Sequence, residues 1–183
     1  MARLYLVRHG RAAAGFGESH DPKLDEIGLG QAEAVARELV SLGPLPILSS
    51  PLRRTRETAA PLAGLWHVEP KIEAAVAEIP SPTDNLQERV TWLRQFMAGS
   101  WRNATMDLAA WREDVIAALL AIPEDTAVFT HYIAINVAIG AAAGDDRVVV
   151  FSPDNCSVTI LETDGGVLRL IEKGREAPLT KVN

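Results

Sequence analysis

Short apolar runs alternate along the chain with longer amphipathic stretches. The runs at residues 4–7, 47–48 and 127–129 each pass directly into polar side chains, as buried parallel strands do at the edge of their sheet. Helical spacing of apolar residues predicts helices at about 25–42, 51–65, 84–97 and 108–120, followed by an Ala-rich helix up to Gly144. Val68 suggests one further short strand.

The C-terminal third follows a different pattern. The apolar stretches 158–161 and 167–171 flank Asp164-Gly165-Gly166, which is a strong signal for a hairpin. The sequence therefore predicts an α/β fold. We expect a three-layer α/β/α sandwich whose sheet is mostly parallel, with an antiparallel C-terminal edge and ligands bound at the carboxyl ends of the strands.

Composition narrows the class of protein. The 183 residues are 48% hydrophobic and 23% charged, which predicts one globular domain over residues 1–183. The single Cys156 cannot form an internal disulfide, which is typical of a protein in a reducing compartment, and we expect a cytoplasmic location. The side chain of Cys156 is expected to be buried. No apolar run is long enough to span a membrane, and the net charge of -6 argues against nucleic acid as a partner. The oligomeric state stays open.

Positively charged and imidazole side chains follow three of the predicted strands. Arg8 and His9 come after the first strand, Arg53 and Arg54 shortly after the second, and His131 after the strand that contains Phe129. Since the carboxyl ends of parallel strands share one edge of a sheet, these residues are expected to meet there. Together they offer the groups that a phosphate site needs.

Five segments, in order, resemble motifs of the histidine phosphatase superfamily, which also contains the cofactor-dependent phosphoglycerate mutases. They are LYLVRHG at residues 4–10, LDEIGLGQA at 24–32, SPLRRT with Thr58-Ala59 at 50–59, VAEI at 76–79 and Thr130-His131. The segment 155–159 also resembles a late strand of that family. The resemblance covers most of the chain and implies a phosphoglycerate mutase-like fold.

The same resemblance implies roles for individual residues. His9 corresponds to the nucleophile, and Arg8, Arg54 and His131 to the groups that hold the phosphate oxygens. Glu78 falls where many members of the family keep a proton donor. Glu73 is the alternative donor. Arg53 and Arg56 are expected to be solvated.

Physical chemistry agrees with a phosphoryl-transfer site. Nearby guanidinium groups disfavour imidazolium, so Arg8 and Arg54 are expected to lower the pKa of His9 and keep a ring nitrogen free to attack phosphorus. Two arginines can stabilise the equatorial phosphate oxygens without a metal. The histidines show no HxxxH or HxH spacing, so we expect no metal and no cofactor.

We therefore expect a metal-independent phosphatase that acts through a phosphohistidine intermediate on His9. The bond that it hydrolyses is a phosphomonoester or a phosphohistidine, and the substrate is a small phosphorylated compound or a phosphoprotein. Two alternatives are a phosphoglycerate-type mutase and a catalytically idle phosphate-binding module. Only the stretch 80–105 can act as a lid, which favours hydrolysis over mutase chemistry. Tyr132 and Ile133 depart from the glycine that is common after the second histidine, and are expected to narrow the pocket.

Overall fold

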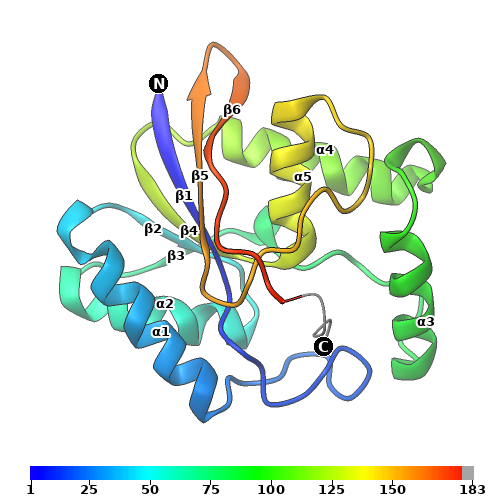
Figure 1. Cartoon of the computed structure of the whole chain (residues 1–183), viewed down its shortest axis with the longest axis horizontal. Helices are drawn as coiled ribbons and strands as arrows, with labels where there is room; N and C mark the ends of the chain where they lie inside the picture. Colours follow the sequence, from blue (N-terminus) through cyan, green and yellow to red (C-terminus); the bar gives the residue numbers. More distant parts are fainter. Residues whose placement is uncertain (179–183) are drawn as a thin grey trace.

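One six-stranded sheet runs through the computed structural model, which describes residues 1–178 (Figure 1). The strands are β1 (Ala2–Arg8), β2 (Ile47–Ser49), β3 (Lys71–Ile72), β4 (Thr126–Thr130), β5 (Val158–Asp164) and β6 (Val167–Glu172). Their order is β3-β2-β4-β1-β5-β6. The first four in this order are parallel, whereas β5 is antiparallel to β1 and to β6. The predicted parallel sheet with an antiparallel C-terminal edge is confirmed.

Helices cover both faces of the sheet. Successive strand residues point to opposite sides, and in the central strands both sets of side chains are apolar and need cover. In β1, Tyr5 and Val7 pack into the cluster that includes α1 (Glu26–Leu39) and α2 (Arg53–Trp66). Leu4 and Leu6 pack on the opposite face, against α4 (Met106–Leu120) and α5 (Tyr132–Ala143). Figure 1 shows the two helix layers on either side of the sheet. The predicted three-layer α/β/α sandwich is confirmed.

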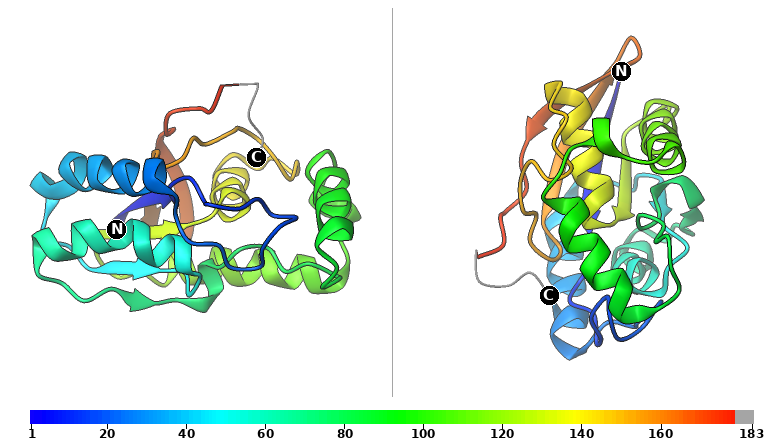
Figure 2. Two further views of the ribbon diagram at one scale, coloured as in Figure 1. Left: turned by 90° about the horizontal axis from the view of Figure 1, so that it is seen from below. Right: turned by 90° about the vertical axis from the view of Figure 1, so that its right-hand side faces the viewer.

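The helix α3 (Leu86–Met97) lies away from the sheet at one end of the molecule (Figures 1 and 2). On this helix the ring of Trp92 stacks on that of Phe96, with ring centroids 5.5 Å apart. The ring of Phe96 in turn packs edge to face against the buried Trp101. The loop that follows β1 reaches across to this helix, as the view from below shows (Figure 2). Three short 3-10 turns complete the fold: η1 (Val40–Leu42), η2 (Ala74–Val76) and η3 (Trp101–Asn103).

Two local predictions are wrong. Val68 is not in a strand, because its N–H closes the end of α2 by bonding to the carbonyl of Ala63, next to the left-handed His67. The third strand is instead β3, three residues later. Pro51 does not enter the first turn of α2, since the helix begins only at Arg53. Leu52 stands at the N-cap position in an extended conformation, and its N–H donates to the hydroxyl of Ser50.

Across residues 1–178, we find no helix that is both long and apolar enough to cross a membrane.

Candidate active site

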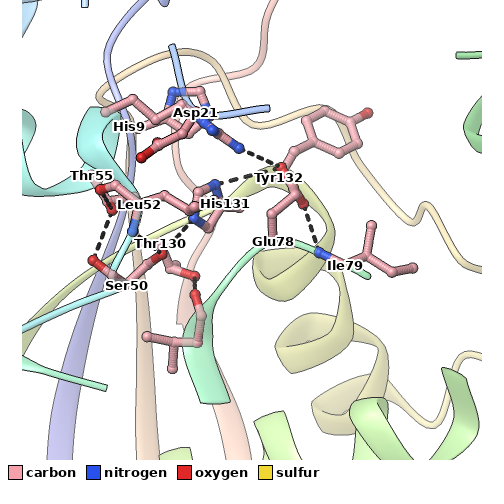
Figure 3. A network of polar contacts seen from close by, with 12 residues as sticks. His9, Asp21, Ser50, Leu52, Thr55, Glu78, Ile79, Thr130, His131 and Tyr132 are labelled. Carbon is pink, nitrogen blue, oxygen red and sulfur yellow. Dashed lines mark hydrogen bonds and ion pairs between the residues drawn. The ribbon is translucent and has the colours of Figure 1, made fainter. Parts of the chain in front are cut away.

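The carboxyl ends of β1, β2 and β4 bring the polar residues of the sequence motifs to one edge of the sheet. Arg8 is in register with Thr130, so His9 and His131 follow at the same level, and Ser49 is in register with Phe129, which puts Ser50 level with Thr130. The ring centroids of His9 and His131 are 5.3 Å apart. The structure thus brings together residues that lie far apart in the sequence (Figure 3).

The backbone at His9 is held from both sides. Its N–H donates to the carbonyl of Thr130 at 3.1 Å, and its carbonyl accepts from the side chain of Asn155 at 2.9 Å. The next residue, Gly10, passes so close to α1 that a Cβ there would lie 2.7 Å from the carbonyl oxygen of Gly28. Glycine is therefore required at position 10 to let the chain turn away after His9.

The hydrogen bonds of His9 define its tautomer. Nδ1 lies 2.8 Å from the carbonyl oxygen of Gly10, which can only accept, so Nδ1 carries the proton. Nε2 accepts from Nε of Arg54 at 3.2 Å and so carries a lone pair. Burial, reinforced by the guanidiniums of Arg54 and Arg8, holds the pKa of His9 well below its usual value of 6.5. The expected depression of this pKa is confirmed, and burial is its largest cause.

Arg54 is the central cation of the site. It sits in the first turn of α2, where the chain leaves β2, and its side chain is buried. Besides His9, it donates through Nη2 to Oε2 of Glu78 at 3.4 Å. Its sequence neighbour Arg53 is exposed and pairs with Glu57, and Arg56 is also exposed, as expected.

Glu78, and not Glu73, reaches the two histidines. Its Oε2 lies 3.5 Å from Nδ1 of His131, and its Oε1 accepts from the N–H of Ile79 (Figure 3). Glu73 instead caps η2 by accepting from the N–H of Ala75, which points it along its own loop. The choice between the two acids, open in the sequence, is decided by the way the chain turns after β3.

His131 is completely buried between Ser50 and Glu78 (Figure 3). Its Nε2 lies 2.8 Å from the hydroxyl of Ser50, and the carboxylate of Glu78 is near its other nitrogen. Burial is the largest cause that lowers the pKa of His131 well below 6.5, followed by the charge of Arg54. Sequence reasoning had assigned no role to Ser50, although it is the residue that fixes the orientation of this ring.

Arg8 is oriented by a loop carbonyl and an aromatic ring. Its Nη1 donates to the carbonyl of Pro153 at 2.8 Å, and its guanidinium lies 5.1 Å from the ring centroid of Tyr132. The hydroxyl of Tyr132 is in turn 2.9 Å from that of Ser152. Desolvation lowers the pKa of Arg8. Tyr132 therefore supports one of the arginines and also takes up space in the pocket.

Arg8, His9, Arg54, Glu78 and Tyr132 line a cavity of about 170 Å³, whereas the fully buried His131 is not among its lining residues. One end is polar and contains Arg8, His9, Arg54 and Glu78. The remaining wall is largely apolar, with contributions from Phe16 in the loop after β1, Leu93 and Met97 on α3, and Tyr132 and Ile133 on α5. Tyr132 and Ile133 both line the cavity beside the second histidine.

A cation could also be held by nitrogen and oxygen atoms of His9, Glu78 and His131, which lie within 4.8 Å of one another. However, Arg54 already donates to Nε2 of His9 and to Oε2 of Glu78. A metal ion would have to displace this guanidinium and would sit next to the charge of Arg8. The arrangement therefore suits an anion better than a cation.

A third arginine, Arg89 on α3, is buried near this site and was not singled out by the sequence patterns. The charges of Arg54 and Glu78 both act on it, and it lines a neighbouring cavity together with them.

Comparison with known proteins gives a consistent result. The family model of the histidine phosphatase superfamily (branch 1) matches residues 4–174. The chain is 39% identical over 90 residues to the 5''-phosphoribostamycin phosphatase of Niallia circulans, covering 44% of this chain and 42% of the relative. It is 36% identical over 111 residues to the probable phosphoglycerate mutase GpmB of Yersinia pestis (strain Pestoides F), covering 55% and 52%. The matches thus span about half the length of these curated relatives.

The fold is also similar to that of a phosphoserine phosphatase from Entamoeba histolytica. The two structures superpose with a TM-score of 0.73 at 22% sequence identity, over 96% of this chain and 98% of the other. At this level of identity the likeness concerns the fold alone.

Proposed function

The chain belongs to the histidine phosphatase superfamily (branch 1), and on that premise we propose that it is a metal-independent phosphatase. It hydrolyses a small phosphate ester, or a phosphohistidine, through a phosphohistidine intermediate on His9. The observation that carries this proposal is the unprotonated Nε2 of His9, which lies beside Arg54 at the polar end of the cavity.

In the first half-reaction, Nε2 of His9 attacks phosphorus in line with the ester oxygen, forming the N–P bond while the P–O bond breaks. Arg8, Arg54 and His131 hold the equatorial oxygens, on which the negative charge is concentrated. In the free protein Arg54 donates to His9 and Glu78. When the phosphate enters, its oxygens take over these N–H groups, and the lone pair of His9 becomes free to attack.

Glu78 provides the proton that the leaving alkoxide needs. Its carboxylate lines the cavity and faces both the catalytic imidazoles and Arg54. Glu78 enters this step as the carboxylic acid and gives its proton to the ester oxygen. In the second half-reaction Glu78 removes a proton from water, the water oxygen bonds to phosphorus, and the N–P bond breaks. Inorganic phosphate leaves, and His9 is again neutral.

The stretch 80–105 acts as a short lid. Its helix α3 contributes Leu93 and Met97 to the wall of the cavity that His9 also lines. A mutase is the second candidate, because one relative is a probable phosphoglycerate mutase. A mutase must retain its substrate while the substrate reorients, and a lid of this size favours early release of the product and hence hydrolysis.

The test is hydrolysis of an aryl phosphate in the presence of a chelator. Wild type and the control His67→Asn should release phosphate and form an acid-labile phosphoenzyme, whereas His9→Ala should do neither. Activity of His9→Ala equal to that of wild type would contradict the nucleophile. Interconversion of phosphoglycerates faster than their hydrolysis would favour the mutase, and absence of any turnover would favour the idle binding module.

A matched experiment tests the proton donor. Glu78→Gln should slow hydrolysis of an alkyl phosphate by about 10²–10⁴-fold, the usual contribution of general acid catalysis. It should slow an aryl phosphate with a good leaving group much less, since that leaving group needs little protonation. Equal losses on both substrates would assign Glu78 to binding instead.

A further inference from the structure

Arg89 in the first turn of α3 is a buried cation that has no carboxylate partner among residues 1–178. The residue is 8% exposed, and its Nε has no hydrogen-bond acceptor among the described residues. No described carboxylate lies within ion-pair distance, although Glu78 and the exposed Asp84 both act on it from farther away. Breaking or omitting one half of a buried ion pair costs several kcal/mol. A buried guanidinium in this state calls for an anion that the described chain does not supply.

The guanidinium of Arg89 is fixed in place by the loop that follows β1. It lies 3.9 Å from the ring centroid of Phe16, and its Nη1 is 2.9 Å from Nδ1 of His20. Because a guanidinium can only donate, Nδ1 of His20 is the acceptor. One face and one nitrogen are thus occupied by neutral partners. They orient the cation and leave its charge unneutralised.

Arg89 adjoins the proposed phosphate site. It lines a cavity of about 200 Å³ together with His20, Arg54 and Glu78, and these three residues also line the cavity that contains His9. Arg54 and Glu78 therefore form part of the wall of both cavities. A small molecule whose phosphate lies at His9 could reach Arg89 with its other end.

The charges of the combined site favour a substrate with more than two negative charges. Arg8, Arg54 and Arg89 contribute three positive charges. Glu78 is the one described acid within ion-pair distance of any of them, whereas Asp84, which also lines the smaller cavity, is exposed and lies farther from Arg89. When Glu78 carries the proton needed for catalysis, a phosphate dianion leaves one positive charge without a partner at ion-pair distance. That excess lies on the side of Arg89, since Arg8 and Arg54 are next to His9.

We infer that Arg89 binds a second anionic group, a carboxylate or another phosphate, on the phosphomonoester whose phosphorus is attacked by His9. This inference rests on the proposed function and adds the substrate class to it. The planar guanidinium can give two parallel N–H bonds to either group. His20 and Phe16 are positioning residues that hold the guanidinium of Arg89 in the orientation needed to bind this second anionic group.

The test compares 3-phosphoglycerate with glycerol 3-phosphate, which carries a hydroxymethyl group in place of the carboxylate, and with glycerol 1,3-bisphosphate. Charge-assisted hydrogen bonds predict that wild type prefers at least one of the two doubly anionic compounds by about 10- to 100-fold in kcat/KM. In Arg89→Gln this ratio should fall below about threefold, and Arg89→Lys should retain part of it. Arg94→Gln, an exposed arginine on the same helix, is the matched control and should keep the ratio.

The ratio does not depend on how much of a variant is folded, because the folded fraction enters both kcat/KM values equally. If Arg89 only holds the loop against α3, Arg89→Gln will lower all three values alike, and the inference is overturned. A wild-type ratio near one for both doubly anionic compounds overturns it as well. A preference confined to one of them supports the inference and identifies the second group.

Failure of the proposed function would look different. If wild type releases phosphate from none of the compounds, or if His9→Ala equals wild type, the phosphatase proposal fails. The anion site is then measured by calorimetry, comparing the binding of 3-phosphoglycerate and glycerol 3-phosphate to wild type and to Arg89→Gln. Tighter binding of the carboxylate that disappears in the variant supports the inference, and equal binding overturns it.

Discussion

Mild acid should destabilise this protein through His9 and His131. Both rings are buried, and desolvation together with the neighbouring guanidiniums holds both pKa values well below 6.5. In the unfolded chain each imidazole is hydrated and titrates near ~6.5. Below this pH the unfolded state binds protons that the folded state does not bind. The free energy of unfolding therefore falls as the pH falls.

The size of the effect follows from linkage. While the folded-state pKa stays below the pH of the assay, each ring removes up to about 1.4 kcal/mol per pH unit. Between about pH 7 and about pH 5.5 the loss integrates to about 1.2 kcal/mol for each ring, and to about 2.5 kcal/mol for both. Total stabilities of domains are only about 5–15 kcal/mol, so the loss is easily measured. The same low pKa keeps the proposed nucleophile unprotonated in mild acid.

Urea unfolding at the two pH values provides the assay, on wild type, His9→Asn and His131→Asn. Each variant should show a pH-dependent loss about 1.2 kcal/mol smaller than that of wild type. His67→Asn is the control, because His67 is exposed and its left-handed backbone (φ 55°) is one that asparagine also adopts. It should keep the wild-type loss. If His9→Asn and His131→Asn lose as much as wild type, the reasoning is refuted.

Three further predictions concern the groups around the phosphate site. Glu78→Ala should lower the free energy of unfolding by about 3 kcal/mol, because Arg54 is left buried without its carboxylate, and inorganic phosphate should restore part of it. Urea titrations with and without phosphate check this, and wild-type stability in phosphate-free buffer would contradict it. Tyr132→Ala should raise KM for an aryl phosphate by about 2- to 30-fold through loss of the ring beside Arg8. Tyr132→Phe, which keeps the ring, should change KM by less than about threefold. Equal effects of both variants on KM would contradict the role assigned to the aromatic ring. Addition of EDTA should leave kcat/KM unchanged, since two guanidiniums supply the positive charge, and a metal-restorable loss above about tenfold would contradict this.

Much of the site could be predicted from the sequence because its residues follow buried strands directly. His9 and His131 each come immediately after a strand of the parallel sheet, and Arg54 opens the helix after β2. Strand ends are readable because an apolar run stops abruptly at a polar residue. Parallel pairing then forces those ends to one edge. The fold class followed from the same pattern, together with the hairpin at Gly165-Gly166.

The role of Ser50 escaped prediction, and the choice between Glu73 and Glu78 stayed open in the sequence, because both depend on how the segments pack in space. Ser50 could be read as part of a motif, but only the packing of β2 beside β4 puts its hydroxyl 2.8 Å from His131. Glu73 and Glu78 are both acids in one irregular segment. Their difference arises because Glu73 caps η2, while Glu78 turns toward the histidines.

By itself, the sequence determined which polar residue follows which strand: His9 after β1, Arg54 after β2 and His131 after β4. It could not assign Arg89, which appears as one charged position on an amphipathic helix. Only the tertiary structure decided that α3 lies against the loop after β1, so that Arg89 meets His20 across 69 residues of sequence. The physical reason is that helical periodicity reports which face is buried, but not which distant segment or ligand covers it.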